Sequence, residues 1–423
     1  MPDRHLGVRP DLEQLRHQAK DLLRQIRRGE PAAVAALDKH HPDAIDPARA
    51  KLAAAQLVLA RSYGVPSWPR IVHACKLIDA IWEDDVHAVR TLVTKHPNLI
   101  HENASGTEQS NWGPPMSYAA NLGRDAIIEL LRGLGATDFE HAVGRAALQG
   151  RIGTARELHA MMGSPRLPAN SLGGPAYTLS ASGTALMLEL GAPVLDDDGK
   201  SIAPVAVVLE TDGRKPREKH EILEMYAARG VPLPDTSVMA LHRGRIDLLE
   251  EHLRRDPSLL RRTFTHEEIF PPEWGCRAEV ETQGTPLAGA TLLHIAIDYD
   301  ELEIARWLLD RGMDVDTPAA VDARGFGGHT ALFGAVVSYA HFWMNYGGKP
   351  QVAPFAELLL DHGANPNVRA SLRKSLARDG DRTVHEYRDV TPLSWGRLFY
   401  DRLLVNEAAM QLIAERGGRD GRT

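Results

Sequence analysis

The chain is poor in the features that most directly reveal a chemistry. Only two of its 423 residues are cysteines, which excludes a disulfide framework and a cysteine-based zinc site and fits a reducing compartment. It has no surplus of basic residues, since 49 lysines and arginines stand against 56 aspartates and glutamates, and the net charge of −7 disfavours nucleic-acid binding. Its apolar runs are too short to cross a bilayer, and the polar residues 1–10 do not resemble a signal peptide. These features predict a cytoplasmic protein that binds neither nucleic acid nor membrane.

The short motifs of common enzymes are missing as well. The sequence has no H-E-x-x-H, C-x-x-C or G-x-S-x-G pattern. A glycine-rich stretch at residues 325–328 lacks the lysine–serine pair of a phosphate-binding loop and is typical of a tight turn. We therefore expect no cofactor and no resident metal ion.

What the sequence does contain is repetition. From Thr291 a short segment, T-L-L-H-I-A, leads to residues 301–310, in which the apolar residues have helical spacing. Gly312 follows at the point where a left-handed helix C-cap is needed. The same unit returns from Thr330 and from Thr391, and weaker copies occur earlier in the chain. This pattern predicts a series of helix pairs.

These units resemble the ankyrin repeat, which has a period of about 33 residues and the signature T-P-L-H-x-A. The resemblance covers roughly residues 77–418. It implies an all-α, ankyrin-type solenoid of helical hairpins, in which each unit buries its apolar face only against its neighbours. It also implies that the motif threonine caps the first helix of its unit, and that His294 bonds to a neighbouring loop.

Residues 1–76 do not follow the repeat. Residues 12–28 have the apolar spacing of an amphipathic helix, Pro31 can begin a second helix, and residues 51–63 are rich in alanine and leucine. This stretch resembles a helical segment that often precedes bacterial ankyrin arrays, and its expected role is to cap the open end of the solenoid. We predict three parts: a helical N-terminal cap over residues 1–76, a degenerate repeat array with long inserted loops over 77–418, and a polar tail over 419–423.

Some units lie too far apart for the bare period, so the chain must carry inserted loops. The four candidate loops are residues 101–114, 263–289, 338–354 and 370–389. Insertions in repeat proteins usually share one face, so we expect these loops to gather along a concave groove. Aromatic and histidine side chains in that groove would anchor a protein or peptide partner. The predicted binding residues are Trp112, His266, Trp274, Tyr299, His329, His341, Trp343 and Tyr387.

Two other functions are compatible with the same loops. A hydrolase or lyase acting on a small polar or sugar substrate would use carboxylates in the groove, and the candidates are Glu267, Glu268 and Asp298. A passive scaffold would use the aromatic side chains only to hold each loop on the helices below it. Recognition of a protein or peptide is the primary prediction, and the acidic net charge favours a basic or neutral partner.

Overall fold

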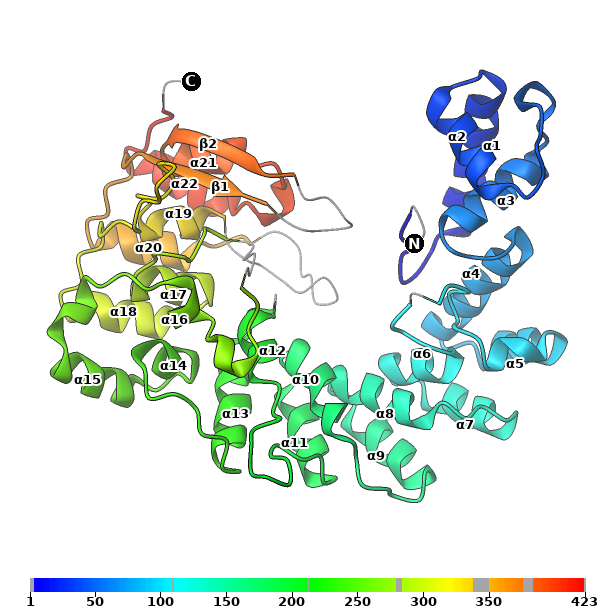
Figure 1. The fold of residues 1–423 in the computed structure, drawn as a ribbon, viewed down its shortest axis with the longest axis horizontal. Helices are drawn as coiled ribbons and strands as arrows, with labels where there is room; N and C mark the ends of the chain where they lie inside the picture. The colour runs from blue at the N-terminus through cyan, green and yellow to red at the C-terminus, as the bar shows by residue number, and fades with distance from the viewer. Residues whose placement is uncertain are drawn as a thin grey trace. The chain divides into compact units, whose positions relative to one another are not determined.

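In a computed structural model of the protein, the chain forms two compact units, Met1–Leu167 (unit 1) and Pro168–Thr423 (unit 2). The structure describes residues 4–108, 110–211, 213–278, 284–337, 350–375 and 383–421. Helices dominate both units (Figure 1). Within these ranges, no helix is long and apolar enough to cross a membrane.

Unit 1 is a stack of helix pairs. Helices α4, α6 and α8 contact one another in series, and each is followed along the chain by a partner helix. Each pair therefore covers the apolar face of its neighbour. The helices are α1 (Leu12–Arg27), α2 (Pro31–His40), η1 (Pro47–Arg49), α3 (Leu52–Ser62), α4 (Trp68–Trp82), α5 (Val86–Lys95), η2 (Pro97–Ile100), α6 (Pro115–Leu122), α7 (Asp125–Gly133), α8 (Phe139–Leu148) and α9 (Ile152–Met161).

The N-terminal helices share an apolar core with α4. As predicted, α1 buries one face at helical spacing, and α2 begins at Pro31. Ile71 and Cys75 of α4 belong to the same core as the buried residues of α1 and α3. The boundary predicted at residue 76 lies within α4, and the predicted division of the chain into three parts stays a prediction. The role of α1 to α3 as a cap stays a prediction.

Unit 2 repeats the same construction. Its elements are η3 (Ala169–Leu172), α10 (Gly173–Tyr177), α11 (Ala181–Glu189), α12 (Val205–Glu210), α13 (Pro216–Ala227), α14 (Ser237–His242), α15 (Ile246–Arg255), η4 (Pro257–Leu260), α16 (His266–Ile269), η5 (Pro272–Trp274), α17 (Leu292–Asp298), α18 (Leu302–Asp310), α19 (Ala331–Val336), α20 (Pro354–Asp361), β1 (Ala370–Lys374), β2 (His385–Val390), α21 (Pro392–Leu398), η7 (Arg402–Leu404) and α22 (Glu407–Glu415).

The helices of unit 2 form two layers. Helices α14, α17, α19 and α21 contact one another in series, and so do α18, α20 and α22. Gly312 follows α18 with a φ of +86°, which is the left-handed conformation predicted for a C-cap. The all-α stack of helical hairpins predicted from the sequence is confirmed.

The loops that precede the first helices are joined by main-chain hydrogen bonds. The N–H of Ala320 donates to the carbonyl of Gly289 at 2.8 Å, and the N–H of Gly327 donates to the carbonyl of Ser371 at 2.7 Å. Gly327 has a φ of +125°, and a Cβ there would meet the carbonyl oxygen of Ala320 at 2.1 Å, so only glycine fits. The loops of unit 2 therefore support one another.

One predicted insertion contains β-strands that the sequence analysis did not foresee. Within residues 370–389, β1 and β2 pair as an antiparallel hairpin, with Lys374 opposite His385. Buried positions alternate along β1, as a strand with one face on a core requires. The strand is short, so its period-two pattern was hidden among charged residues.

Candidate functional site

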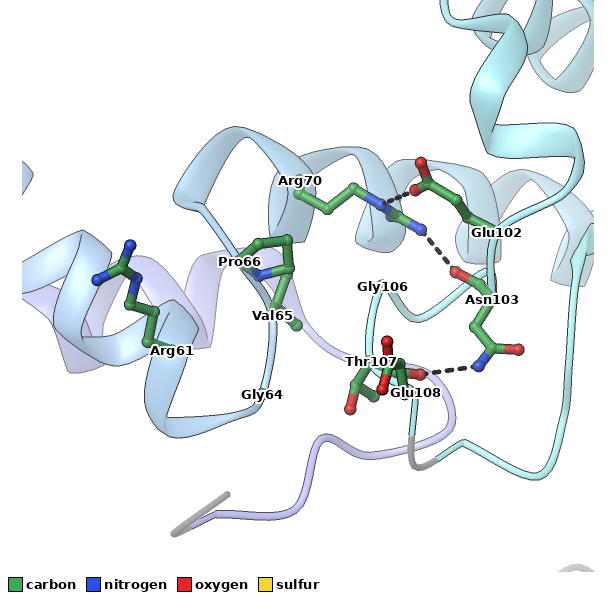
Figure 2. A pocket seen from close by; sticks show the side chains of 10 residues that line it. All are labelled: Arg61, Gly64, Val65, Pro66, Arg70, Glu102, Asn103, Gly106, Thr107 and Glu108. Carbon is green, nitrogen blue, oxygen red and sulfur yellow. Dashed lines mark hydrogen bonds and ion pairs between the residues drawn. The ribbon is translucent and has the colours of Figure 1, made fainter. Parts of the chain in front are cut away.

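Unit 1 contains a polar pocket between the α3–α4 turn and the loop that follows η2. Its volume is about 680 Å³, which is within the range of small-molecule and short-peptide sites. Figure 2 shows the turn and the loop facing each other across it. The lining residues are Arg61, Gly64, Val65, Pro66, Arg70, Glu102, Asn103, Gly106, Thr107 and Glu108.

Arg70 holds the loop wall of the pocket in place. Ser67 caps α4 and places Arg70 in the first turn, where its side chain is only 9% exposed. The guanidinium donates through Nε to Glu102 Oε2 at 2.8 Å and through Nη2 to the carbonyl of Asn103 at 2.6 Å. Burial would raise the pKa of Glu102, but hydrogen bonds from Asn98 and Arg70 hold it below its ordinary value. The loop is therefore fixed by a charged pair that is complete without a ligand.

Gly106 lets the loop approach this arginine closely. It has a φ of +76°, and a Cβ at this position would lie 3.0 Å from Arg70 Cζ. The opposite wall offers no main-chain donor, because the N–H groups of Gly64 and Val65 close the end of α3 and Pro66 has none. The main chain therefore shapes both walls of the pocket, and side chains supply the groups that could bond to a ligand.

Two charged side chains of the pocket differ in position and sign. Glu108 is exposed on the loop side, and Arg61 lies on the α3 side, where its Nη1 donates to the carbonyl of His40 at 3.0 Å (Figure 2). Among the described lining residues, Thr107 supplies a hydroxyl group, and Glu102 and Glu108 supply carboxylates. These side chains can form hydrogen bonds and ion pairs with a polar ligand.

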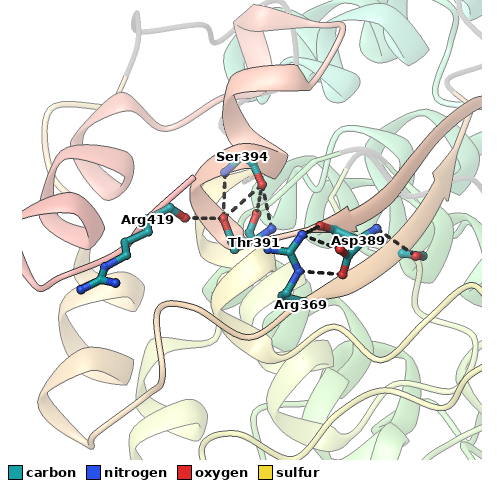
Figure 3. Close-up of polar contacts among 6 residues, drawn as sticks. Arg369, Asp389, Thr391, Ser394 and Arg419 are labelled. Carbon is teal, nitrogen blue, oxygen red and sulfur yellow. Dashed lines mark hydrogen bonds and ion pairs between the residues drawn. The ribbon is translucent and has the colours of Figure 1, made fainter. Parts of the chain in front are cut away.

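In unit 2, the motif residues at the start of α21 form a closed capping network (Figure 3). Thr391 Oγ1 accepts a hydrogen bond from the N–H of Ser394 at 3.2 Å, and Ser394 Oγ accepts one from the N–H of Thr391 at 2.7 Å. Thr391 Oγ1 also donates to the carbonyl of Arg419 at 2.7 Å. The predicted capping role of the motif threonine is confirmed at this unit.

Replacing Thr391 with valine is expected to lower the free energy of unfolding by about 1–2 kcal/mol, because the new side chain cannot form these bonds. Thr330→Val is the matched control. Thr330 stands at the same motif position before α19, but its buried Oγ1 has no hydrogen-bond partner among the described residues, so valine there should be neutral or stabilising. Urea denaturation of both variants measures the difference, and equal losses would contradict the capping argument.

The motif histidine is also used internally. His294 Nε2 lies 3.0 Å from the carbonyl oxygen of His329, and its Nδ1 lies 2.8 Å from Thr291 Oγ1, so the ring donates to the loop and accepts from the threonine. The predicted bond of His294 to a neighbouring loop is confirmed. His329 Nε2 in turn bonds the carbonyl of Pro286 at 3.2 Å. Burial lowers the pKa of His294 to about 4 and that of His329 to about 3.

This bonded histidine and its capped helix lie within a recognisable repeat. Residues 288–317 match the family model of the ankyrin repeat. Among curated proteins, none matches this chain. A similar solved structure is the crystal structure of the ankyrin repeat domain of Bcl-3, described as a unique member of the IkappaB protein family. That chain has 13% sequence identity over 80% of this chain and 97% of its own, and the TM-score of 0.20 is too low to indicate a shared arrangement.

The ankyrin repeat at residues 288–317 contributes to a buried ion cluster around Tyr299. Arg214 Nη2 lies 2.8 Å from Asp298 Oδ2, and Lys219 Nζ lies 2.8 Å from Glu301 Oε1. Each of these four side chains is at most 4% exposed. Both cations lie 4.5 Å from the centre of the Tyr299 ring. The two positive and two negative charges balance, which is what a dry interior requires.

Two histidines complete the cluster. His220 Nε2 lies 2.7 Å from the same oxygen of Glu301, and His242 contacts the Tyr299 ring edge-on at 4.5 Å. Burial would raise the pKa of Glu301, but Lys219 and His220 hold it below its ordinary value. Burial and the nearby cations hold the pKa of His242 well below its ordinary value, so this ring is neutral.

Four of the eight predicted binding residues are buried. The exposed fractions of Trp112, Tyr299, His329 and Tyr387 are 3%, 2%, 1% and 7%. The Trp112 ring lies 4.4 Å from that of Tyr118, and Tyr299 donates its hydroxyl to a main-chain carbonyl. This burial leaves the four side chains little free surface, and their role as ligand anchors stays a prediction. The same burial supports the alternative that they hold their own loops on the helices.

The other four predicted binding residues have different outcomes. His266 and Trp274 keep partial exposure on the loop between η4 and α17, and His266 Nε2 bonds the carbonyl of Arg277 at 3.0 Å. His341 and Trp343 lie outside the described residues. His266 and Trp274 are therefore the predicted residues that remain available to a partner in the described structure.

The three carboxylates of the enzymatic alternative have separate environments. Glu267 is exposed, while Glu268 accepts from the N–H of Thr265 at 2.8 Å and caps α16. Asp298 is buried against Arg214. Asp298, turned inward against Arg214, is not accessible in the way that a glycosidase carboxylate must be. In the described residues as a whole, no group of three or more histidine, cysteine, aspartate or glutamate side chains is placed so that it could hold a metal ion.

The sequence analysis singled out Tyr299 and Asp298 of the ion cluster, but not Arg214, Lys219 or Arg70. Lys219 shares a helical face with the buried Ile222 and Tyr226. A lysine among apolar residues on one helical face can indicate a buried ion pair, and the sequence contained this signal. Arg70 lies in the first turn of α4, and no pattern in the sequence around it indicated a buried ion pair. Its partner Glu102 is 32 residues away, and only the tertiary structure brings them together.

Proposed function

We propose that this chain is a recognition protein that binds a peptide segment of another protein, and that the pocket beside Arg70 receives part of that segment. Ankyrin repeats generally mediate protein–protein interaction, and one such repeat lies at residues 288–317. The observation that carries the proposal is the pocket itself, which has a polar wall fixed by Arg70 and a suitable volume.

The charges around the pocket favour a partner segment with both signs of charge. The exposed carboxylate of Glu108 attracts a lysine or arginine of the partner, and the guanidinium of Arg61 attracts a carboxylate. The net charge of −7 adds a general preference for basic partners. In unit 2, we propose His266 and Trp274 as a further contact region, because a partly exposed tryptophan supplies large apolar area with a polar edge.

The test begins with peptides selected from a random library on the wild-type chain. Glu108→Lys is expected to weaken their binding roughly ten-fold, because it reverses the charge on the loop side of the pocket. Glu157→Lys, the same change at an exposed site on α9 of unit 1, should alter Kd less than about two-fold. Isothermal titration calorimetry gives the values. Selected peptides that are insensitive to both Glu108→Lys and Trp274→Ala would overturn the proposal.

A further inference from the structure

A second feature of unit 1 lies beside the pocket and is occupied by the chain itself. Four aromatic side chains, Tyr63, Trp82, Trp112 and Tyr118, form what we call the aromatic groove. Residues 4–9, which we call the arm, run across it. We propose that the aromatic groove is a binding site for an extended partner peptide in which an aliphatic residue is followed, three positions later, by an arginine, and that the arm is a displaceable occupant of this site.

The aromatic groove is assembled from separate segments. The Trp112 ring lies 4.4 Å from the Tyr118 ring and 6.4 Å from the Trp82 ring. Arg145 Cζ lies 5.1 Å from the centre of the Trp112 ring. These residues come from the ends of α3 and α4, the loop before α6, α6 itself and α8. The result is a rigid apolar floor with polar edges, which is the kind of surface that binds extended peptides.

The arm shows which chemistry the groove accepts. Leu6 is 8% exposed and belongs to the apolar core that Tyr63 shares with residues of α1 and α3, so its side chain is the apolar anchor of the arm. The carbonyl of Val8 accepts a hydrogen bond from the Tyr118 hydroxyl. Arg9 donates through Nε to Asp79 Oδ1 at 2.9 Å, and its Cζ lies 5.5 Å over the Trp82 ring. The aliphatic residue and the arginine are three positions apart, which defines the spacing in the proposal.

The arm is held by its side chains more than by its main chain. It has no helical or strand structure, and among the described residues its main chain makes one hydrogen bond to other main-chain groups, from Arg4 N–H to the carbonyl of Ser62 at 3.0 Å. The pair of Arg9 with Asp79 is exposed, at 42% and 47%, and such pairs contribute little stability.

The fit of the arm is also incomplete. A cavity of about 60 Å³ remains between the arm and the floor, and it is lined by Gly7, Asn111 and Trp112 among others. Gly7 itself is exposed, so the main chain of the arm crosses this part of the groove without filling it. A partner peptide of the same chemistry would compete with the arm for the same contacts.

The proposal is tested with the full chain and a fluorescein-labelled heptapeptide of the sequence of residues 4–10, R-H-L-G-V-R-P. Arg9→Glu loosens the arm by placing a negative charge against Asp79 and Glu83. Arg16→Glu is the matched control, because it makes the same change at an exposed arginine of α1. The heptapeptide should bind Arg9→Glu roughly ten-fold more tightly than wild type or Arg16→Glu, since the competing arm is removed.

A heptapeptide with glutamate in place of its second arginine should not bind the Arg9→Glu chain. Circular dichroism and urea midpoints establish that both variants are folded. No saturable binding to Arg9→Glu, or equal affinity for Arg16→Glu, would overturn the inference. Concentration-dependent dimers held by exchanged arms would also overturn it, since a second copy would then be the occupant. None of these outcomes depends on Glu108, so the pocket proposal is tested separately.

Discussion

Replacing Asp298 with alanine is expected to lower the free energy of unfolding by roughly 3–5 kcal/mol. The substitution leaves the guanidinium of Arg214, which is 4% exposed, without its carboxylate partner in a dry interior. Arg214 Nε also donates to the carbonyl of residue 298 at 2.5 Å, but that neutral acceptor does not balance the charge. This is among the largest losses expected from a single substitution in the chain.

Two further variants show how much of the loss in unfolding free energy comes from leaving a buried charge unpaired and how much from losing the ion pair itself. The double substitution Arg214→Met with Asp298→Leu removes both charges and should cost far less than Asp298→Ala alone, because neither partner is left buried and unpaired. Glu221→Ala breaks the exposed i,i+4 pair with Arg217 and should cost under about 1 kcal/mol. Urea denaturation measures all three, and a loss under about 1 kcal/mol for Asp298→Ala would refute the buried cluster.

Acidification from pH 7 to pH 5 is expected to destabilise unit 2 by about 2 kcal/mol for each of three buried histidines, His242, His294 and His329. In the unfolded chain a histidine has a pKa of about 6.5. Burial lowers the folded-state pKa of His294 to about 4 and of His329 to about 3, and it holds that of His242 well below its ordinary value. The unfolded state therefore binds more protons, and stability present at neutral pH is lost as the pH falls.

His242→Phe isolates one of these contributions. Neither ring nitrogen of His242 has a hydrogen-bond partner among the described residues, so phenylalanine removes the titrating group without breaking such a bond. The variant should lose about 2 kcal/mol less than wild type between pH 7 and pH 5. Urea denaturation at several pH values measures the slope. An unchanged slope would show that His242 does not titrate in this way.

Local sequence was sufficient for the helices of the repeats. The unit from Thr291 to Gly312 carries a capping residue, a helical apolar period and a left-handed terminator within about twenty residues, so each signal acts on its neighbours. Such short-range rules led correctly to the helix start at Pro31 and to the role of His294. The hairpin of β1 and β2 was missed because strand pairing joins residues up to 20 positions apart.

Two tryptophans show the limit of such reasoning. Trp112 and Trp274 both precede a glycine with positive φ and both stand in an inserted loop, yet Trp112 is 3% exposed and Trp274 is only half-buried. The difference lies in partners from other segments, since Trp112 meets Trp82, Tyr118 and Arg145. No pattern around either tryptophan carries that information.

The sequence by itself therefore determined the class of fold and the chemistry of each repeat motif, because caps, turns and helical periods depend on residues a few positions apart. Only the tertiary structure decided which side chains are exposed and which charges are buried together. Arg214 and Asp298 are 84 residues apart, and whether such a pair forms depends on how successive helix pairs stack. Burial and charge pairing are properties of that stacking, and they set the pocket, the ion cluster and the aromatic groove.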